Sequence, residues 1–236
     1  MRLLARVEGS VLWLFDAYPG VKANLTKEAE KRGIDPARLV FAPHVSVPDH
    51  LARQKLADLF LDTVPINAHT TASEALWVGL PVLTIRGGAF VGRVAASLLT
   101  AMGLPELIAE SAADYEQRAL HLATHPTALA ELKQKLAANR VTSPLYDTPR
   151  FTRHIETAFQ RMWDIWAAGG EPEPFSVSPI PKATSPQSIS ANQISSGSCA
   201  APKISRRFYA ACPLCASRDV AVFTTADCTA HPSYAP

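Results

Sequence analysis

The residues with the clearest chemical potential lie in one segment, 62–81, with the sequence DTVPINAHTTASEALWVGLP. His69, Thr70 and Thr71 place an imidazole and two hydroxyls in succession where a helix is expected to start. A helix N-terminus also offers unpaired N–H groups and a partial positive charge, so these donors together suit a phosphate or diphosphate. Glu74 follows one turn later, where its carboxylate could accept hydrogen bonds from ribose hydroxyls. A plainer interpretation stays open, in which Thr70 is an N-cap and Glu74 an ordinary helix-start carboxylate.

The elements that must position this segment are short apolar runs that alternate with helical stretches. Such alternation predicts an α/β fold with βαβ units, a parallel sheet and helices on both faces. Ligands bind such sheets outside the carboxyl ends of the strands, and residue 62 lies at one of those ends. The expected strands are 11–16, 39–42, 57–61 and 82–85, and the expected helices are 24–32, 48–55, 71–78 and 93–102.

After Pro105 the pattern is helical only, and its last helix carries an apolar stripe. Such a stripe most often packs into a core, so we expect this helix to lie against the sheet rather than to bind a partner. The helices are expected at residues 112–124, 126–139 and 149–168, and the stripe consists of Phe151, Ile155, Phe159, Met162 and Trp163.

The composition excludes several classes of protein. With 23 Lys and Arg against 21 Asp and Glu, the net charge of the 236 residues is only +2, so no nucleic-acid partner is expected. No apolar run approaches the roughly 18 residues of a membrane span, and Glu8 with Gly9 interrupts the apolar N-terminal stretch, which argues against a signal peptide. All four cysteines lie after residue 198, so disulfides do not hold the earlier residues together and a reducing, cytoplasmic location is expected.

Three regions follow one another along the chain. Residues 1–170 carry the strand and helix pattern, and residues 208–236 form a tail that regains apolar residues and cysteine. Between them, residues 171–207 are rich in Pro and Ser and almost free of aromatic residues. Such a composition buries too little surface to offset the entropy of ordering, so we expect a disordered linker between a folded lobe and the tail.

The tail carries a second chemical pattern, C-x2-C-x12-C-x2-H. A CxxC pair holds two thiolates at the spacing of a tetrahedral zinc site, and the later Cys and His could complete that site. The alternative is a disordered tail with reactive thiols. The zinc ligands would be Cys212, Cys215, Cys228 and His231.

Several blocks resemble the C-terminal catalytic lobe of the protein O-GlcNAc transferase family, in the right order along residues 1–170. The longest is LFLDTVPINAHTTASEALWVGLPVLTIRGGAFVGRVAASLL, and the others are VLWLF, RLVFAPHVSVPDHLARQKLAD and SPLYDTPRFTRHIETAFQRMW. The resemblance implies a GT-B glycosyltransferase, which has two Rossmann-like lobes with a sugar nucleotide between them. It implies transfer of N-acetylglucosamine from UDP-GlcNAc to Ser or Thr of proteins, with inversion and without a metal cofactor.

The same resemblance assigns roles to residues outside the helix start. His50 and Arg53 fall on family positions near the nucleotide, although solvated helix residues are the alternative for both. Val45 falls where the backbone reads the uracil edge, and at Val47 many members carry a Lys that packs beside the base. This departure at Val47 keeps a GDP-fucose-type donor open as an alternative.

For the helix start itself, the resemblance implies that His69, Thr70 and Thr71 contact the diphosphate and that Glu74 holds the ribose, where many members carry Asp. Arg93 follows Gly92 where the family has Ser, so we interpret Arg93 as a structural residue that forms an ion pair at a helix start.

The family lobe begins with a further strand and helix that carry a Gln and a Lys for the sugar diphosphate, and Met1 falls midway in that helix. The N-terminal lobe with its histidines and the helical repeats that select acceptors have no counterpart either. We therefore expect a fragment that is inactive alone and that exposes a new sheet edge. A non-catalytic nucleotide-binding or interaction module is the alternative.

The tail, YAACPLCASRDVAVFTTADCTAHPSYAP, also resembles the zinc-binding start of a family of SAM-dependent C-methyltransferases. In that resemblance the second cysteine pair comes later, beyond Pro236. A methyltransferase fusion is therefore a further alternative, but no Gly-rich SAM loop is present and no methyl transfer is expected from this chain.

Overall fold

The computed structural model describes residues 1–16, 20–181 and 221–224. These residues form two compact units, which are treated separately below. The first runs from Met1 to Tyr146 and includes the strand β6 (Ala221–Thr224), and the second begins at Asp147. The first unit contains every residue of the segment 62–81 and therefore holds the candidate site.

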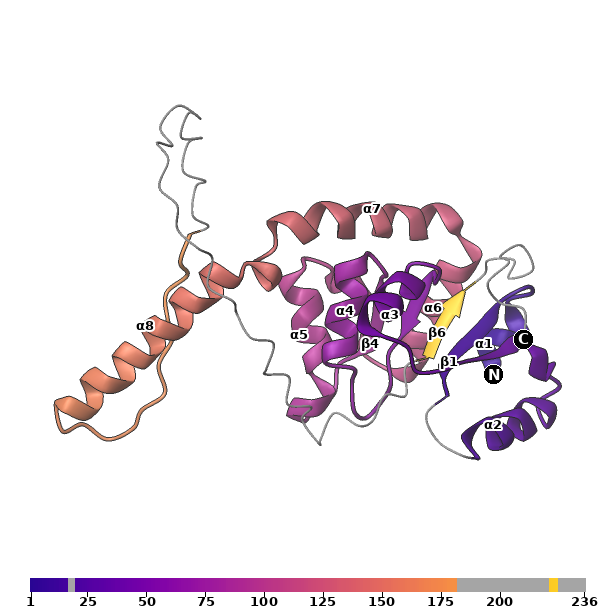
Figure 1. Cartoon of the computed structure of the whole chain (residues 1–236), viewed down its shortest axis with the longest axis horizontal. Coiled ribbons are helices and arrows are strands. Elements are labelled where there is room, and N and C mark those ends of the chain that lie inside the picture. The colour runs from indigo at the N-terminus through magenta and orange to yellow at the C-terminus, as the bar shows by residue number, and fades with distance from the viewer. Residues whose placement is uncertain (17–19, 182–220, 225–236) are drawn as a thin grey trace, which may run out of the picture. The chain divides into compact units, whose positions relative to one another are not determined.

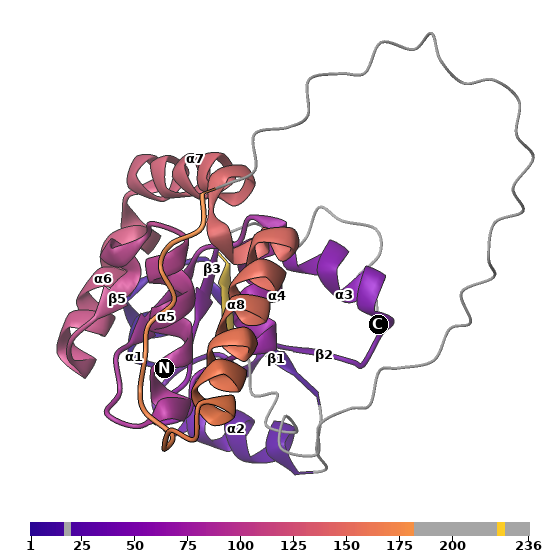
Figure 2. The same cartoon turned by 90° about the vertical axis from the view of Figure 1, so that its left-hand side faces the viewer.

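The first unit is built on a six-stranded sheet in the order β2-β1-β6-β3-β4-β5. Its strands include β1 (Val11–Phe15), β2 (Leu39–Ala42), β3 (Leu59–Leu61), β4 (Val82–Ile85) and β5 (Ile108–Ala109). Strands β1 and β2 pair in parallel, as do β3, β4 and β5, which confirms the predicted parallel sheet for this part of the chain. Figure 2 shows β2 and β1 toward one end of the sheet and β5 toward the other.

Two strands of the sheet were not predicted from the sequence. Strand β5 has only two residues, which is too short for a periodic pattern to reveal. Strand β6 lies in the tail and pairs antiparallel with both β1 and β3, so the sheet is mixed rather than wholly parallel. Its partners are far away in the sequence, and no local signal identifies them.

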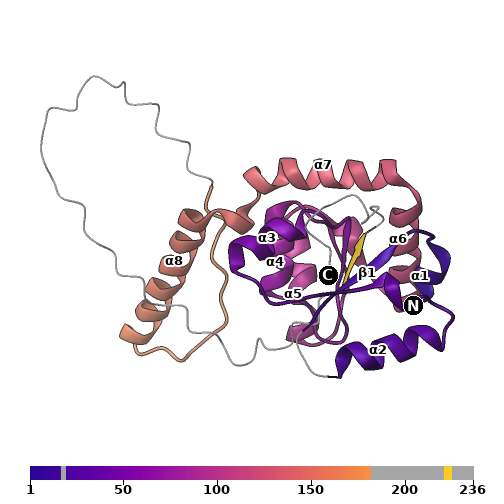
Figure 3. The same ribbon diagram turned by 45° about the vertical axis from the view of Figure 1, so that its right-hand side comes forward.

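Helices cover both faces of this sheet, as the alternation of elements predicts (Figure 3). Helices α3, α4 and α5 lie toward one face, and α1 and α6 lie toward the other, with α7 packed on α6. The helix predicted from Asn24 begins three residues earlier, because Gly20 adopts the left-handed conformation before it. The helices are α1 (Arg2–Arg6), α2 (Val21–Glu30), α3 (Val47–Gln54), α4 (Thr70–Val78), α5 (Val94–Ala101), α6 (Ala112–Thr124) and α7 (Pro126–Thr142).

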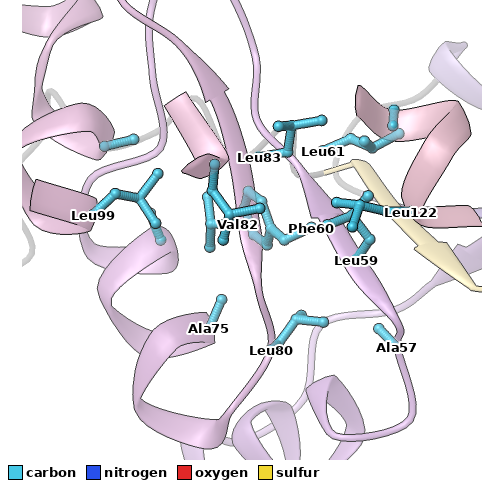
Figure 4. Packing of buried hydrophobic residues seen from close by; sticks show 14 of the residues in the cluster. Ala57, Leu59, Phe60, Leu61, Ala75, Leu80, Val82, Leu83, Leu99 and Leu122 are labelled. Atoms are coloured by element: carbon cyan, nitrogen blue, oxygen red, sulfur yellow. The ribbon is translucent and has the colours of Figure 1, made fainter. Parts of the chain in front are cut away.

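The core lies on both faces of β3 and β4, whose residues are almost all buried. Figure 4 shows Phe60 and Val82 between Leu99, which comes from α5, and Leu122, which comes from α6. Each large apolar side chain buried in this way contributes about 1.5–3 kcal/mol relative to an exposed one. The two strands that lead into the candidate site are therefore the most firmly packed ones.

The second unit contains α8 (Thr148–Ala167), which Asp147 caps by accepting a hydrogen bond from the Arg150 N–H. No residue of α8 is buried, and the expected packing of its apolar stripe against the sheet stays a prediction. Trp163, for example, remains 59% exposed. The unit's other described residues, up to 181, form no helix or strand, but they contact α8, for example through the hydrogen bond from the Ile180 N–H to the His154 Nε2 at 3.0 Å.

The zinc prediction falls outside the described residues, since Cys212, Cys215, Cys228 and His231 all lie beyond residue 181 and outside β6. The same holds for most of the linker. Within the described ranges no group of three or more metal-binding side chains comes together, so the zinc site stays a prediction for the tail. None of the helices described is long and apolar enough to cross a bilayer.

The loops after β3 and β4 approach each other closely. The Asn67 N–H donates to the Val91 carbonyl at 2.9 Å. A Cβ atom at residue 92 would lie 2.7 Å from the Pro65 carbonyl oxygen. This distance is too short for a carbon and an oxygen atom, so any side chain there would displace the backbone. Gly92 is therefore the residue that allows the two loops to meet.

We expect Gly92→Ala to lower the free energy of unfolding by about 1–3 kcal/mol, because the added methyl group must push the two loops apart. Urea titration followed by circular dichroism measures this loss. Gly88→Ala is the matched control in the same loop, since a Cβ there meets nothing within 4 Å. Equal stability of the two variants would show that the loops separate freely.

Candidate functional site

The candidate site lies at the edge of the sheet where its parallel strands end. Strands β1 to β4 run in the same direction, because β1 and β3 are both antiparallel to β6, so their carboxyl ends share one edge. The loop 43–46 leads from β2 to α3, and the loop 62–69 leads from β3 to α4. Two helix N-termini therefore begin at the edge where ligands bind sheets of this type.

A buried carboxylate shapes the loop between β3 and α4. Asp62 follows β3 directly, and its Oδ1 accepts hydrogen bonds from the N–H groups of Thr63 at 2.9 Å and Ala68 at 2.6 Å. Its Oδ2 accepts from the Thr84 hydroxyl on β4, also at 2.6 Å. The Tyr115 hydroxyl from α6 donates to the Asp62 carbonyl at 3.0 Å. These bonds close the loop and fix the point at which α4 begins.

The environment of Asp62 changes its acidity. Burial raises the pKa of its carboxyl group, and the hydrogen bonds from Thr84, Ala68 and Thr63 oppose that rise. Burial also raises the pKa of the Tyr115 hydroxyl, so this group stays a neutral donor. The loop is thus held by a carboxylate whose accepted hydrogen bonds offset part of the cost of burying it.

The N-terminus of α4 offers donors that no side chain of its own satisfies. His69 is the N-cap residue and makes no side-chain cap, and the first turn carries no acidic residue. At the neighbouring start of α3, by contrast, Ser46 caps the helix and Asp49 adds a carboxylate. An anion is therefore better accommodated at α4 than at α3.

The placement of Thr70 decides between the two interpretations of this segment. Thr70 is the first residue of α4 rather than its N-cap, so the plainer interpretation is wrong on this point. Its side chain is exposed, and that of Thr71 is partly exposed. The His69 ring packs edge-on against Phe90 at 6.1 Å, and its Nε2 lies 3.3 Å from the Val91 carbonyl oxygen. The loop after β4 thus orients His69.

The structure also brings together residues predicted from separate blocks. His50 on α3 lies with its Nε2 3.8 Å from the Glu74 Oε2 on α4. The Arg53 guanidinium lies 3.1 Å from the His50 Nδ1 and donates to the Pro43 carbonyl at 2.7 Å. It also stacks over the Trp13 ring at 5.8 Å. His50 and Arg53 are therefore held by neighbours and are not simply solvated helix residues.

The surroundings of Val45 and Arg93 give less support to a specific role for either residue. Val45 lies partly buried in the loop between β2 and α3, at the same edge as the other predicted residues. Val47, the first residue of α3, is 64% exposed and leaves room for a ligand beside it. Arg93 is the exposed N-cap of α5, and the ion pair expected for it is not found among the described residues.

Sequence reasoning missed three buried polar residues of this region: Asp62, Gln54 and Asn67. Gln54 is 3% exposed, and its Nε2 lies 2.8 Å from the His50 Nε2. The Gln54 Oε1 and the Asn67 Oδ1 are buried and have no hydrogen-bond partner within the described chain. The only signal in the sequence was the position of Asp62, a charged residue that directly follows an apolar strand.

The site combines polar groups at the start of α4 with one carboxylate acceptor further along the same helix. The start of α4 supplies backbone N–H groups, two hydroxyls and an imidazole, all of which suit phosphate oxygens. One turn along the same helix, the Glu74 carboxylate suits a diol. The arrangement fits a phosphorylated sugar or a nucleotide whose phosphates point at the helix.

Comparison with known proteins gives a consistent result. A model of glycosyl transferase family 41 matches residues 1–155. A UDP-N-acetylglucosamine–peptide N-acetylglucosaminyltransferase of Caenorhabditis elegans is 35% identical over 170 residues, which cover 72% of this chain and 15% of that protein. SEC of Arabidopsis thaliana, named as a probable enzyme of the same activity, is 35% identical over 74% of this chain and 18% of its own length.

A solved structure agrees with these relatives. A mutant O-GlcNAc transferase of Thermobaculum terrenum superposes with a TM-score of 0.58 at 35% identity, over 62% of this chain and 28% of that one. The Rossmann-like fold is therefore that of a lobe in a GT-B transferase. The chain spans less than a fifth of the length of the two curated relatives.

The raised pKa of Asp62 predicts a pH dependence of stability. Because the folded-state pKa lies above the ordinary value of 3.8, the free energy of unfolding falls as pH rises from 3.8 through the folded-state pKa. Asp62→Asn should remove this fall, since an amide keeps the acceptor for the loop and can donate to Thr84.

Urea titrations at intervals between pH 4 and pH 7 measure the effect as the difference between Asp62→Asn and the unmodified chain. Glu8→Gln, at an exposed carboxylate, is the control and should keep the original slope. An identical slope in Asp62→Asn and the unmodified chain would contradict the assignment.

Proposed function

The chain belongs to glycosyl transferase family 41, and on that premise we propose that its first unit is the lobe that binds the sugar nucleotide in a protein O-GlcNAc transferase. The donor is UDP-GlcNAc, and the acceptors are Ser or Thr side chains of proteins. The observation that carries the proposal is the start of α4, where His69, Thr70 and Thr71 lie without a side-chain cap at the carboxyl edge of the sheet.

Each group of the donor has a counterpart in the site. The diphosphate receives hydrogen bonds from the first turn of α4 and from the Thr70 and Thr71 hydroxyls. The ribose hydroxyls donate to Glu74, which now lies beside His50 and would exchange that contact for the ligand. The uracil lies over the loop 43–46, where the backbone of Val45 reads its edge, and His50 and Arg53 border it.

The chemical contribution of this lobe is to stabilise the leaving group. When the bond between the sugar and the diphosphate breaks, negative charge develops on the departing UDP. N–H groups and the partial positive charge at the start of α4 favour this charge and are already oriented before the reaction. His69, held by Phe90 and Val91, borders the same position. No residue is assigned as the catalytic base, and no metal enters the proposal.

The second candidate is a GDP-fucose-type donor on the same site. The observation that favours it is the exposed Val47 at the start of α3, which provides no charged group beside a base. A purine would use the open surface there, whereas the phosphate and ribose contacts would be the same. Preference between UDP and GDP therefore separates the two donors.

Isothermal titration with UDP tests the proposed site. We expect Thr71→Ala to weaken UDP binding by roughly 10- to 100-fold, because a hydrogen bond to a charged group contributes about 1.5–3 kcal/mol. Alanine preserves the helix, so the loss reports on the hydroxyl. Thr124→Ala, at the end of α6, is the matched control and should bind UDP normally.

Stronger binding of GDP than of UDP would favour the second donor. Binding of UDP that Thr71→Ala leaves unchanged would place the phosphates elsewhere and overturn the assignment of α4.

Transfer is expected to need more than this chain. The residues assigned above bind the donor, and the chain spans only 28% of the solved transferase. We expect the purified chain to bind UDP but to transfer no sugar from UDP-GlcNAc to protein acceptors, as followed by mass spectrometry of the acceptor. Transfer above the rate of a Thr71→Ala control would contradict this expectation.

A further inference from the structure

The strand at the centre of the sheet comes from the tail of the chain. Strand β6 lies between β1 and β3 and runs antiparallel to both. In the register of the sheet, Val222 is paired with Trp13 of β1 on one side and with Phe60 of β3 on the other. The segment therefore pairs with two strands at once. Figure 1 shows this strand, in yellow, within strands from the other end of the chain.

Strand β6 is also what connects the two halves of the sheet. Strands β1 and β2 pair with each other, and β3 pairs with β4, but among the described strands β1 and β3 meet only through β6. Adjacent strands lie about 4.8 Å apart, so the space between β1 and β3 is about 10 Å wide, which is the width that one strand fills. Two rows of backbone N–H and C=O groups face this space.

An empty space at this position would be costly. Leu59, Phe60 and Leu61 of β3 are all buried, so their backbone groups could not turn to water without opening the core. Buried backbone groups without hydrogen-bond partners are strongly destabilising. A strand is therefore required here, and its backbone, more than its side chains, satisfies the requirement.

We propose that the space between β1 and β3 is a strand-acceptor site, and that the chain's own residues 221–224 occupy it as an exchangeable strand. The occupant adds by β-augmentation, through main-chain hydrogen bonds on both of its sides. Only four residues pair, and the strand runs antiparallel to both of its neighbours. An extended peptide of the same sequence, supplied in trans, therefore competes for the site.

The first experiment tests the occupant in the full chain. Leu14 and Ala221 face each other in the register, and opposed antiparallel residues have Cα atoms about 4.5–5.5 Å apart, within reach of a disulfide. In a chain whose four cysteines are Ser, we expect Leu14→Cys with Ala221→Cys to form an intramolecular disulfide under mild oxidation at least tenfold faster than Leu14→Cys with Thr224→Cys, because Thr224 pairs with Val11 instead.

Mass spectrometry of tryptic peptides and non-reducing gels identify the product. Equal rates in the two pairs, or a disulfide that forms only between two chains, would overturn the assignment of the chain's own segment.

The second experiment tests exchange. A fluorescein-labelled peptide with the sequence of residues 217–227 should bind Val222→Pro at least tenfold more tightly than the unmodified chain, because proline cannot complete a central strand and leaves the site free. The same peptide with proline at its Val222 position is the control and should not bind. Equal fluorescence anisotropy with both chains would overturn exchange, and the disulfide experiment remains decisive if Val222→Pro does not fold.

Discussion

The hydrogen bonds of the Asp62 carboxylate are the constraint on which the site depends. The carboxylate accepts from both ends of one loop, at Thr63 and Ala68, and from the neighbouring strand at Thr84. Because these donors come from three places, the loop cannot shift along the sheet without losing several bonds at once. The same hydrogen bonds fix the start of α4. The N–H groups of a helix start stabilise an anion most when they are already oriented toward it.

The surroundings of Asp62 make its negative charge compatible with the proposed phosphate site. A buried carboxylate close to an anion site would weaken it, but the donors around Asp62 use its oxygens within the loop. Burial raises its pKa, and the interaction with His69 acts in the opposite direction. His69 is thus tied on one side to the loop that Asp62 closes and on another to Phe90 and Val91. The imidazole is positioned by both loops that frame the site.

The sequence predicted those parts of the structure that depend on local pattern. The apolar runs at 39–42 and 82–85 became β2 and β4 at the expected bounds, and the segment HTTASEALWV became the start and body of α4. The rest depends on distant partners. The role of Asp62 requires Thr84 on the next strand, β6 pairs with strands from the other end of the chain, and Gln54 is recognised only through His50. The stripe of α8 had the right periodicity, but periodicity does not identify what covers a face.

The site's geometry also bears on how a transferase uses such a lobe. All the assigned donors lie at one edge of one sheet, and Thr70 and Val47 are exposed to solvent there. In the proposed function, the helix start and Glu74 hold the phosphates and the ribose at this open surface. Transfer needs an oriented acceptor and the exclusion of water, because water competes with the acceptor hydroxyl for the sugar.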